Sequence, residues 1–145
     1  MKKQKINYFK DIVKRVSMES TCTRVSVGAI LVRDQRIIAT GWNGVPAEDI
    51  HCKDFFKDKS IELHAKFSEE NELHAEQNLL AFCAKNGIMT NDSILFLTIS
   101  PCIHCAKLLV SSGIKEVYYI EEYDRDQRGI DFLIDHCIVC KKIVE

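Results

Sequence analysis

Hydrophobic and polar positions in the first third of the chain follow a helical period and then two strand patterns. Apolar residues recur at spacings of three and four between lysines from Ile6 to Val16, which predicts an amphipathic helix over residues 5–18. Residues 25–32 are almost continuously apolar and rich in β-branched side chains, as is typical of a central strand covered on both faces. After a polar turn, residues 36–41 return as a second strand, so we expect a β-hairpin.

From residue 72 onward, helix and strand patterns alternate. The predicted elements are a helix opened by His74 with Asn71 as its N-cap, a buried strand at 93–98, a helix from Pro101 to Gly113, a strand at 116–120, a last helix around 130–134 and an edge strand at 137–144. Such alternation indicates an α/β sheet with parallel pairings and right-handed crossovers.

Between these two parts, the sequence Gly41-Trp42-Asn43-Gly44 ends the second strand, and residues 45–68 show no periodicity. The Asn43 amide can both donate and accept, which suits a sugar hydroxyl, although it could equally serve only to shape a turn. We expect residues 45–68 to be a long irregular loop, and such loops are either functional or disordered.

Length and composition narrow the class of protein. With 145 residues and 46% hydrophobic positions, we expect residues 1–145 to form a single domain around one core. The 20 basic and 21 acidic side chains give a formal charge of −1, which argues against stable nucleic-acid binding. No stretch resembles a signal peptide or a membrane span, and seven cysteines, an odd number, favour reduced thiols and metal over disulfides. We therefore expect a cytoplasmic protein with no membrane association.

The strongest candidate chemistry lies in His74-Ala75-Glu76 and Pro101-Cys102-Ile103-His104-Cys105. A catalytic zinc ion takes about three protein ligands and leaves a fourth tetrahedral position for water, and one imidazole with two thiolates meets that requirement. Cysteines three apart at a helix start face the same side, where the helix N-terminus lowers thiol pKa. Pro101 suits the first turn of that helix.

Glu76 completes this arrangement as a free carboxylate. It follows His74 by two residues, roughly 200° round a helix, so both side chains would not bind one ion in the same way. A carboxylate beside the metal can instead take a proton from water and pass it to a ring nitrogen. His-x-Glu followed by Pro-Cys-x-x-Cys is the known signature of zinc nucleobase deaminases, and the alternatives are a structural zinc knuckle or unrelated cysteines on a core helix.

Other cysteines and histidines give weaker signals. Cys22, Cys52, His64 and Glu72 could supply four ligands to a second, closed zinc site, although their spacing alone makes a weak case. Cys137 and Cys140 form a second Cys-x-x-Cys, but in a strand their sulfur atoms would point to opposite faces, so we assign them no site. We expect Cys83 to be a core residue and His104 to point away from the metal.

Taken together, these motifs resemble the deoxycytidylate (dCMP) deaminase family, over residues 19–135. The motifs that carry the resemblance are Ser20-Thr21-Cys22-Thr23-Arg24, Val27-Gly28-Ala29, residues 36–44, His74-Ala75-Glu76, Pro101 to Lys107 and Ser112-Gly113-Ile114-Lys115. The resemblance implies a cytidine deaminase-like fold, a three-layer α/β/α sandwich with a five-stranded mixed sheet. It also implies zinc-dependent hydrolysis of dCMP to dUMP and ammonia, supplying dUMP for thymidylate synthesis.

The resemblance also assigns roles to residues. His74, Cys102 and Cys105 would hold catalytic zinc, with Glu76 as the proton shuttle. Arg24 and Tyr123 would lie near the 5′-phosphate, Asn43 would meet the deoxyribose and Ala75 would line the substrate site. Some relatives hold a second, structural zinc at positions matching Cys22, Cys52, His64 and Glu72. The family includes homo-oligomers, hexamers or dimers, with dCTP and dTTP as effectors, and this chain has Trp42 where tyrosine is usual.

Two other functions are consistent with the motifs. A related zinc deaminase would act on free cytidine, a tRNA adenosine or another small base, although free-cytidine enzymes usually present cysteine where His74 stands. A zinc-stabilised binding protein would have no turnover. The fourth position on the metal distinguishes the latter, because a protein side chain there would close the site.

Overall fold

The computed structural model describes residues 1–22, 25–46, 49 and 61–144. In chain order its elements are α1 (Lys3–Ser17), β1 (Gly28–Arg33), β2 (Arg36–Trp42), α3 (Ile61–Asn71), α4 (Ala75–Asn86), β3 (Ile94–Ile99), α5 (Ile103–Ser111), β4 (Glu116–Glu121), α6 (Arg128–Asp135) and β5 (Val139–Lys142). Among the described residues, no helix combines the length and apolar character needed to cross a membrane.

The strands form one five-stranded sheet in the order β2-β1-β3-β4-β5. β1 pairs antiparallel with β2 and β3, whereas β3, β4 and β5 run parallel to one another. Each parallel pair is joined through a helix, α5 or α6, as parallel strands require. The mixed α/β sheet predicted from the sequence is therefore confirmed.

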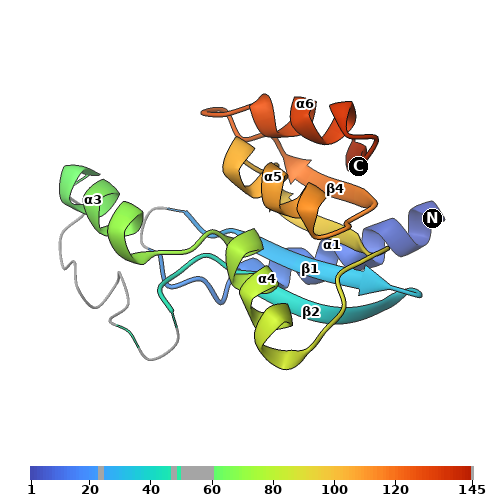
Figure 1. Ribbon diagram of the computed structural model, residues 1–145, viewed down its shortest axis with the longest axis horizontal. Coiled ribbons are helices and arrows are strands. Elements are labelled where there is room, and N and C mark those ends of the chain that lie inside the picture. Colours follow the sequence, from blue (N-terminus) through green and yellow to red (C-terminus); the bar gives the residue numbers. More distant parts are fainter. Residues whose placement is uncertain (23–24, 47–48, 50–60, 145) are drawn as a thin grey trace.

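Helices cover both faces of this sheet (Figure 1). α1 packs on one face, where Phe9 and Val13 join Ile30, Phe96 and Tyr118 in a core cluster. A second cluster on the other face joins side chains of α4, α5 and α6 to alternate strand residues such as Leu95 and Leu97. Because successive strand residues point to opposite faces, β3 contributes to both cores.

α1 approaches β1 closely enough to restrict the residue at the start of that strand. A Cβ atom added at Gly28 would come within 2.7 Å of backbone atoms of Val13 and Ser17. This close approach holds α1 against the start of β1, directly after Val25 and Val27, which line the candidate site.

Several predicted boundaries are wrong. Residues 61–68, expected to be irregular, belong to α3, and Asn71 ends that helix instead of capping the next one. His74 itself is the N-cap of α4. Pro101 precedes α5, because Cys102 is the N-cap of that helix. β5 begins at Val139, since Cys137 has a φ of 61° that a strand does not allow.

Candidate active site

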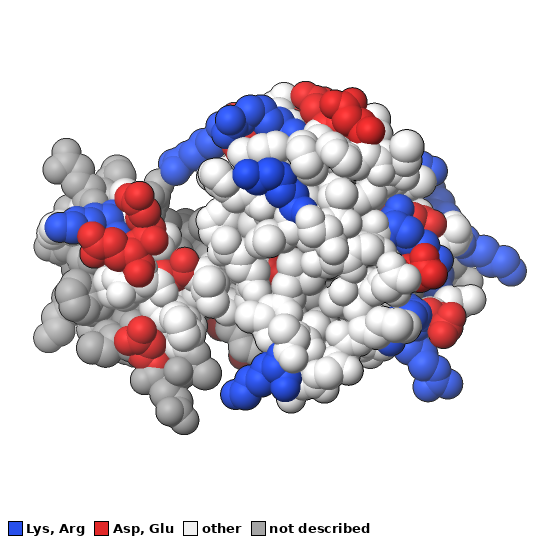
Figure 2. Space-filling model, in the orientation of Figure 1, with Lys and Arg blue, Asp and Glu red and all other residues white. Residues whose placement is uncertain are grey.

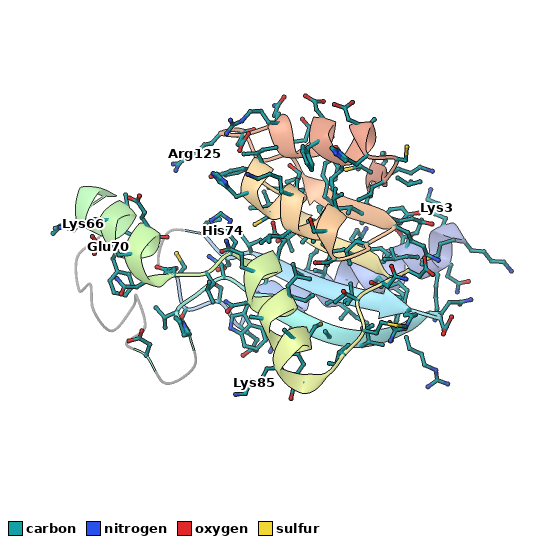
Figure 3. The ribbon with its side chains drawn as sticks, in the orientation of Figure 1. Lys3, Lys66, Glu70, His74, Lys85 and Arg125 are labelled. Carbon is teal, nitrogen blue, oxygen red and sulfur yellow. The ribbon has the colours of Figure 1, made fainter. Side chains whose placement is uncertain are left out.

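His74 is held in place by the start of α4. Its backbone is extended, with φ −68° and ψ 158°, and its N–H donates to Oε1 of Gln77 at 2.8 Å. This is one half of a capping box, which fixes where the chain enters the helix. Figure 3 shows the His74 side chain in the region between α4 and α5.

The two cysteines are positioned by the start of α5. Cys102 is the N-cap, and its Sγ atom accepts a hydrogen bond from the Cys105 N–H at 3.5 Å. Nδ1 of His74 lies 3.6 Å from Sγ of Cys102 and 3.3 Å from Sγ of Cys105. Tetrahedral ligands at zinc bond lengths are about 3.6 Å apart, so this donor set fits a zinc ion. Within the described part of the chain, the group has three protein donors.

The electrostatics of this group favour a thiolate. A hydrogen bond from the Cys105 thiol, with His74 nearby, lowers the pKa of Cys102 to about 4. The hydrogen bond with Cys102 in turn raises the pKa of His74. The pKa of Cys105 is raised because its proton bridges to Cys102. A negative charge therefore forms readily on the Cys102 sulfur, beside the imidazole.

Glu76 lies in the first turn of α4 and is only 4% exposed. Burial raises the pKa of its carboxyl, and the side chain is within hydrogen-bonding reach of the Cys105 thiol. It does not belong to the set of donor atoms that lie within 4.8 Å of one another. The geometry thus gives a buried carboxyl beside the three ligands.

A cavity of about 410 Å³ opens onto this group. Its volume falls within the range of small-molecule sites. Of the residues expected to contact a substrate, Asn43, Ala75 and Tyr123 line it, whereas Arg24 lies outside the described residues. Arg125 contributes the single arginine or lysine among the described lining residues.

The Asn43 side chain makes the contacts expected of a residue that shapes a turn, which is one of the two roles that the sequence allows. Its Oδ1 accepts from the Val27 N–H at 2.8 Å and its Nδ2 donates to the Val25 carbonyl at 2.9 Å. Its own carbonyl accepts from the Ser20 hydroxyl at 3.0 Å. Asn43 therefore holds the segment before β1 against the cavity, and contact with a sugar stays a prediction.

A second group of donors lies along the same cavity. Sγ of Cys22 is 3.5 Å from Nε2 of His64, which is 3.8 Å from Oε1 of Glu72. The side chains of His64 and Glu72 are 4% and 3% exposed, and Oε1 of Glu72 has no hydrogen-bond partner among the described residues. A buried carboxylate oxygen in this condition fits a metal ligand. Cys52, the predicted fourth ligand, lies outside the described residues.

The remaining cysteine and histidine predictions have clear outcomes. Cys83 is 1% exposed in the core, as expected. His104 is exposed and, among the described residues, does not belong to the donor group of His74, Cys102 and Cys105. Cys137 is exposed and Cys140 half-buried, and both are free thiols.

Two polar residues beside the site were missed by sequence reasoning. Ser100, 3% exposed, follows β3 and lines the cavity. Asp126 follows β4, and hydrogen bonds from Arg128 hold the pKa of its carboxyl well below the usual range. Their position in the sequence, after two strands predicted to be parallel, could have identified them, because ligands bind at the carboxyl ends of such strands.

Comparisons with known proteins agree with this geometry. Residues 3–121 match the family model of the cytidine and deoxycytidylate deaminase zinc-binding region. Deoxycytidylate deaminase of Enterobacteria phage T4 is 32% identical over 152 residues, covering 82% of this chain and 79% of that protein. ComE operon protein 2 of Bacillus subtilis is 40% identical over 116 residues, covering 80% of this chain and 59% of that protein.

The fold agrees with a solved structure as well. The dCMP deaminase of cyanophage S-TIM5, crystallised in complex with dCMP and dUMP, superposes with a TM-score of 0.85 at 36% identity and covers 98% of both chains. A family model spanning most of the chain, together with these similarities, leads to one conclusion: the chain belongs to the cytidine and deoxycytidylate deaminase family, whose common feature is a zinc-binding region.

Proposed function

We propose that this protein is a zinc-dependent enzyme that hydrolyses dCMP to dUMP and ammonia. The observation that carries the proposal is the convergence of Nδ1 of His74 with the sulfur atoms of Cys102 and Cys105, beside the buried carboxyl of Glu76. Among the residues that the structure describes, this group has three protein donors, and a zinc site with three protein ligands keeps a fourth position for water, which supports a catalytic site over a closed structural one. The relatives named deoxycytidylate deaminase support the choice of substrate.

In the proposed reaction the chain's own residues hold the ligands and move protons. His74, Cys102 and Cys105 would hold the zinc ion, which would lower the pKa of a water molecule and so supply the nucleophile. Glu76 takes a proton from the water that attacks C4 of the cytosine and delivers it to N3. The same carboxyl then carries the second proton to the amine, which leaves as ammonia. One water is consumed and no other reactant is needed.

The nucleotide would lie along the cavity, with the base next to Glu76 and the phosphate at the rim. Ala75, at the start of α4, and Asn43 are buried residues that line the cavity, and we assign them to the base and the deoxyribose. We assign Tyr123 and Arg24 to the 5′-phosphate. Arginine suits this role because its planar fork matches phosphate oxygens.

Replacing Glu76 with glutamine tests the proton shuttle directly. Glu76→Gln keeps the size of the side chain but removes the proton acceptor, so we expect dCMP turnover to fall by about a hundredfold to ten thousandfold. Zinc content by elemental analysis should stay unchanged. Glu69→Gln, which makes the same change at an exposed position of α3, is the matched control and should remain fully active. Substantial activity in Glu76→Gln would rule out the shuttle.

Turnover of three substrates tests the nucleotide. We expect dCMP to be favoured over deoxycytidine, because binding of the phosphate contributes to transition-state stabilisation, and over dCTP. A preference for deoxycytidine would overturn the assignment of the cavity rim to phosphate. Adding dCTP or dTTP to the dCMP assay tests their predicted role as effectors.

We further propose that the chain binds a second, structural zinc ion through Cys22, Cys52, His64 and Glu72. The short distances among Cys22, His64 and Glu72 and the buried Glu72 carboxylate support it. Four protein ligands would close this site to water. Elemental analysis should find about two zinc ions per chain in the wild type and about one in His64→Ala. His104→Ala, at an exposed histidine, should keep both, and an unchanged count in His64→Ala would exclude this ligand set.

We also propose that the chain forms a homo-oligomer, a hexamer or a dimer. Figure 2 shows that the surface over α4 and α5 carries few charged side chains. Phe82 on α4 and Leu108 on α5 are 48% and 43% exposed. Light scattering measures the mass in solution, and Leu108→Glu should reduce it if this surface is buried between copies. A monomeric wild type would refute the proposal.

A further inference from the structure

The segment that joins β4 to α6 is held against the chain that carries the two cysteines. The Ser100 N–H donates to the Glu121 carbonyl at 2.8 Å, and the Ser100 hydroxyl accepts from the Tyr123 N–H at 2.8 Å. Ser100 is buried and directly precedes Pro101-Cys102. The first part of this segment is therefore fixed relative to the ligand turn, which we define as residues 100–103.

The second part is held by the carboxylate of Asp126. Its Oδ2 accepts from the Ile103 N–H at 3.0 Å. Ile103 opens α5 between Cys102 and Cys105, where a backbone N–H has no partner within the helix. Arg128 orients the same carboxylate from the other side, with Nε at 2.9 Å from Oδ1 and Nη2 at 3.2 Å from Oδ2. The Asp126 side chain is 13% exposed and that of Arg128 73%.

Residues 121–125, which lie between these fixed points, all line the cavity. Arg125 is the single arginine or lysine among the described lining residues, and Figure 3 shows it on the same side of the molecule as His74. The hydrogen bonds of Ser100 and Asp126 thus fix the backbone on both sides of Arg125 relative to Cys102 and Cys105. Any substrate with an anionic end and a reacting end must match that separation.

From this geometry we infer that Asp126 is a positioning residue, which holds Arg125 where it meets the phosphate of a nucleoside monophosphate whose base is at the metal group. The inference rests on the proposed function. Asp126 itself touches neither the substrate nor the metal. Arg125 would thus add a phosphate contact to those already assigned, and Asp126 would reduce the freedom of the segment that carries it before the substrate arrives, which favours a productive orientation.

Substitutions at Asp126 should separate phosphorylated from unphosphorylated substrates. Asp126→Ala removes the acceptor for Ile103, so we expect KM for dCMP to rise about tenfold, while kcat/KM for deoxycytidine and zinc content stay unchanged. Asp126→Asn keeps a carbonyl oxygen at this position and should recover most of the dCMP affinity. Asp131→Ala, at an exposed position of α6, is the matched control.

Arg125→Ala completes a double-mutant cycle. If Asp126 acts through Arg125, Asp126→Ala should add little to the rise in KM once Arg125 is absent. Fully additive effects would overturn the inference. Equal losses for dCMP and deoxycytidine, or loss of zinc in Asp126→Ala, would also overturn it, because they would indicate a structural role at the ligand turn.

Hydrogen exchange of the Ile103 amide gives a readout independent of turnover. Exchange should be faster in Asp126→Ala than in the wild type and close to wild type in Asp126→Asn. If the wild type fails to deaminate dCMP but these exchange rates behave as expected, the proposed function fails while the hydrogen bond itself stands. If the Ile103 amide exchanges at the same rate in all variants, the positioning contact is absent and the inference fails.

Discussion

The chain carries two Cys-x-x-Cys motifs of the same spacing in different surroundings. Cys102 and Cys105 are buried at the start of α5 and face Nδ1 of His74. Cys137 and Cys140 flank the start of β5, where Cys137 is exposed with a φ of 61°. Within the described part of the chain, these two belong to no group of donors close enough to share a metal ion.

The comparison shows that the element at which a Cys-x-x-Cys begins decides its chemistry. At a helix start both sulfur atoms face one side, and hydrogen bonds lower the pKa of Cys102 to about 4. At the sheet edge, burial raises the pKa of Cys140 to about 11. A spacing rule without a third ligand therefore does not identify a metal site.

The largest contrast should come from removing each pair of thiols. Cys102→Ser with Cys105→Ser should lose one zinc ion and reduce deamination by about a thousandfold or more, because the metal supplies several kcal/mol of transition-state stabilisation. Cys137→Ser with Cys140→Ser should keep zinc and activity. Elemental analysis and steady-state kinetics measure both. Loss of zinc from the second pair would show that β5 contributes a metal site after all.

A smaller effect should follow from adding a methyl group to α6 where this helix packs against the Cys102–Cys105 motif. A Cβ atom at Gly129 would lie 2.0 Å from the Pro101 carbonyl oxygen and 2.8 Å from that of Cys102. Gly129→Ala should therefore push α6 from the ligand turn, lower the free energy of unfolding by about 1–3 kcal/mol and weaken zinc binding. Gly87→Ala, where a Cβ meets open space at φ 67°, should cost about 1 kcal/mol and leave zinc affinity unchanged. Thermal unfolding measures the loss of stability in each variant, and zinc titration against a chelator shows whether zinc affinity falls in Gly129→Ala alone.

Much of the fold could be predicted because the strands are strongly patterned. Every residue of β1 is buried except Arg33. A continuous run of small and apolar residues such as this one indicates a strand covered on both faces. α3 was not predicted because the side chains that the structure describes in it show no apolar stripe: His64 and Phe67 are buried, whereas Leu63 is 56% exposed. A helix that buries a histidine gives no periodic apolar signal.

The candidate site could be predicted where two residue types at fixed spacing imply one chemistry. His74, Cys102 and Cys105 were placed together from the sequence, and the structure brings their donor atoms within 4.8 Å. Asp126 could not be found in this way. Its contact with Ile103 spans 23 positions and involves a backbone N–H, which carries no sequence signal. Asn43 likewise acts on the backbone of Val25 and Val27.

The smallest expected effect concerns the two thiols of the second motif themselves. With a pKa of about 11, Cys140 is about 0.1% thiolate at pH 8, and its thiolate fraction grows about tenfold for each pH unit up to that pKa. A thiol-alkylating reagent at pH 8 should therefore react more slowly with Cys140, which is half-buried and almost fully protonated, than with Cys137, which is exposed. Mass spectrometry of digested protein measures both rates, and in Cys137→Ser the second motif should show only the slow, pH-dependent reaction at Cys140. A chelator should accelerate modification of Cys102 and Cys105 and leave Cys140 unchanged; acceleration at Cys140 would mean that metal binds there, and the contrast between the two motifs would be lost.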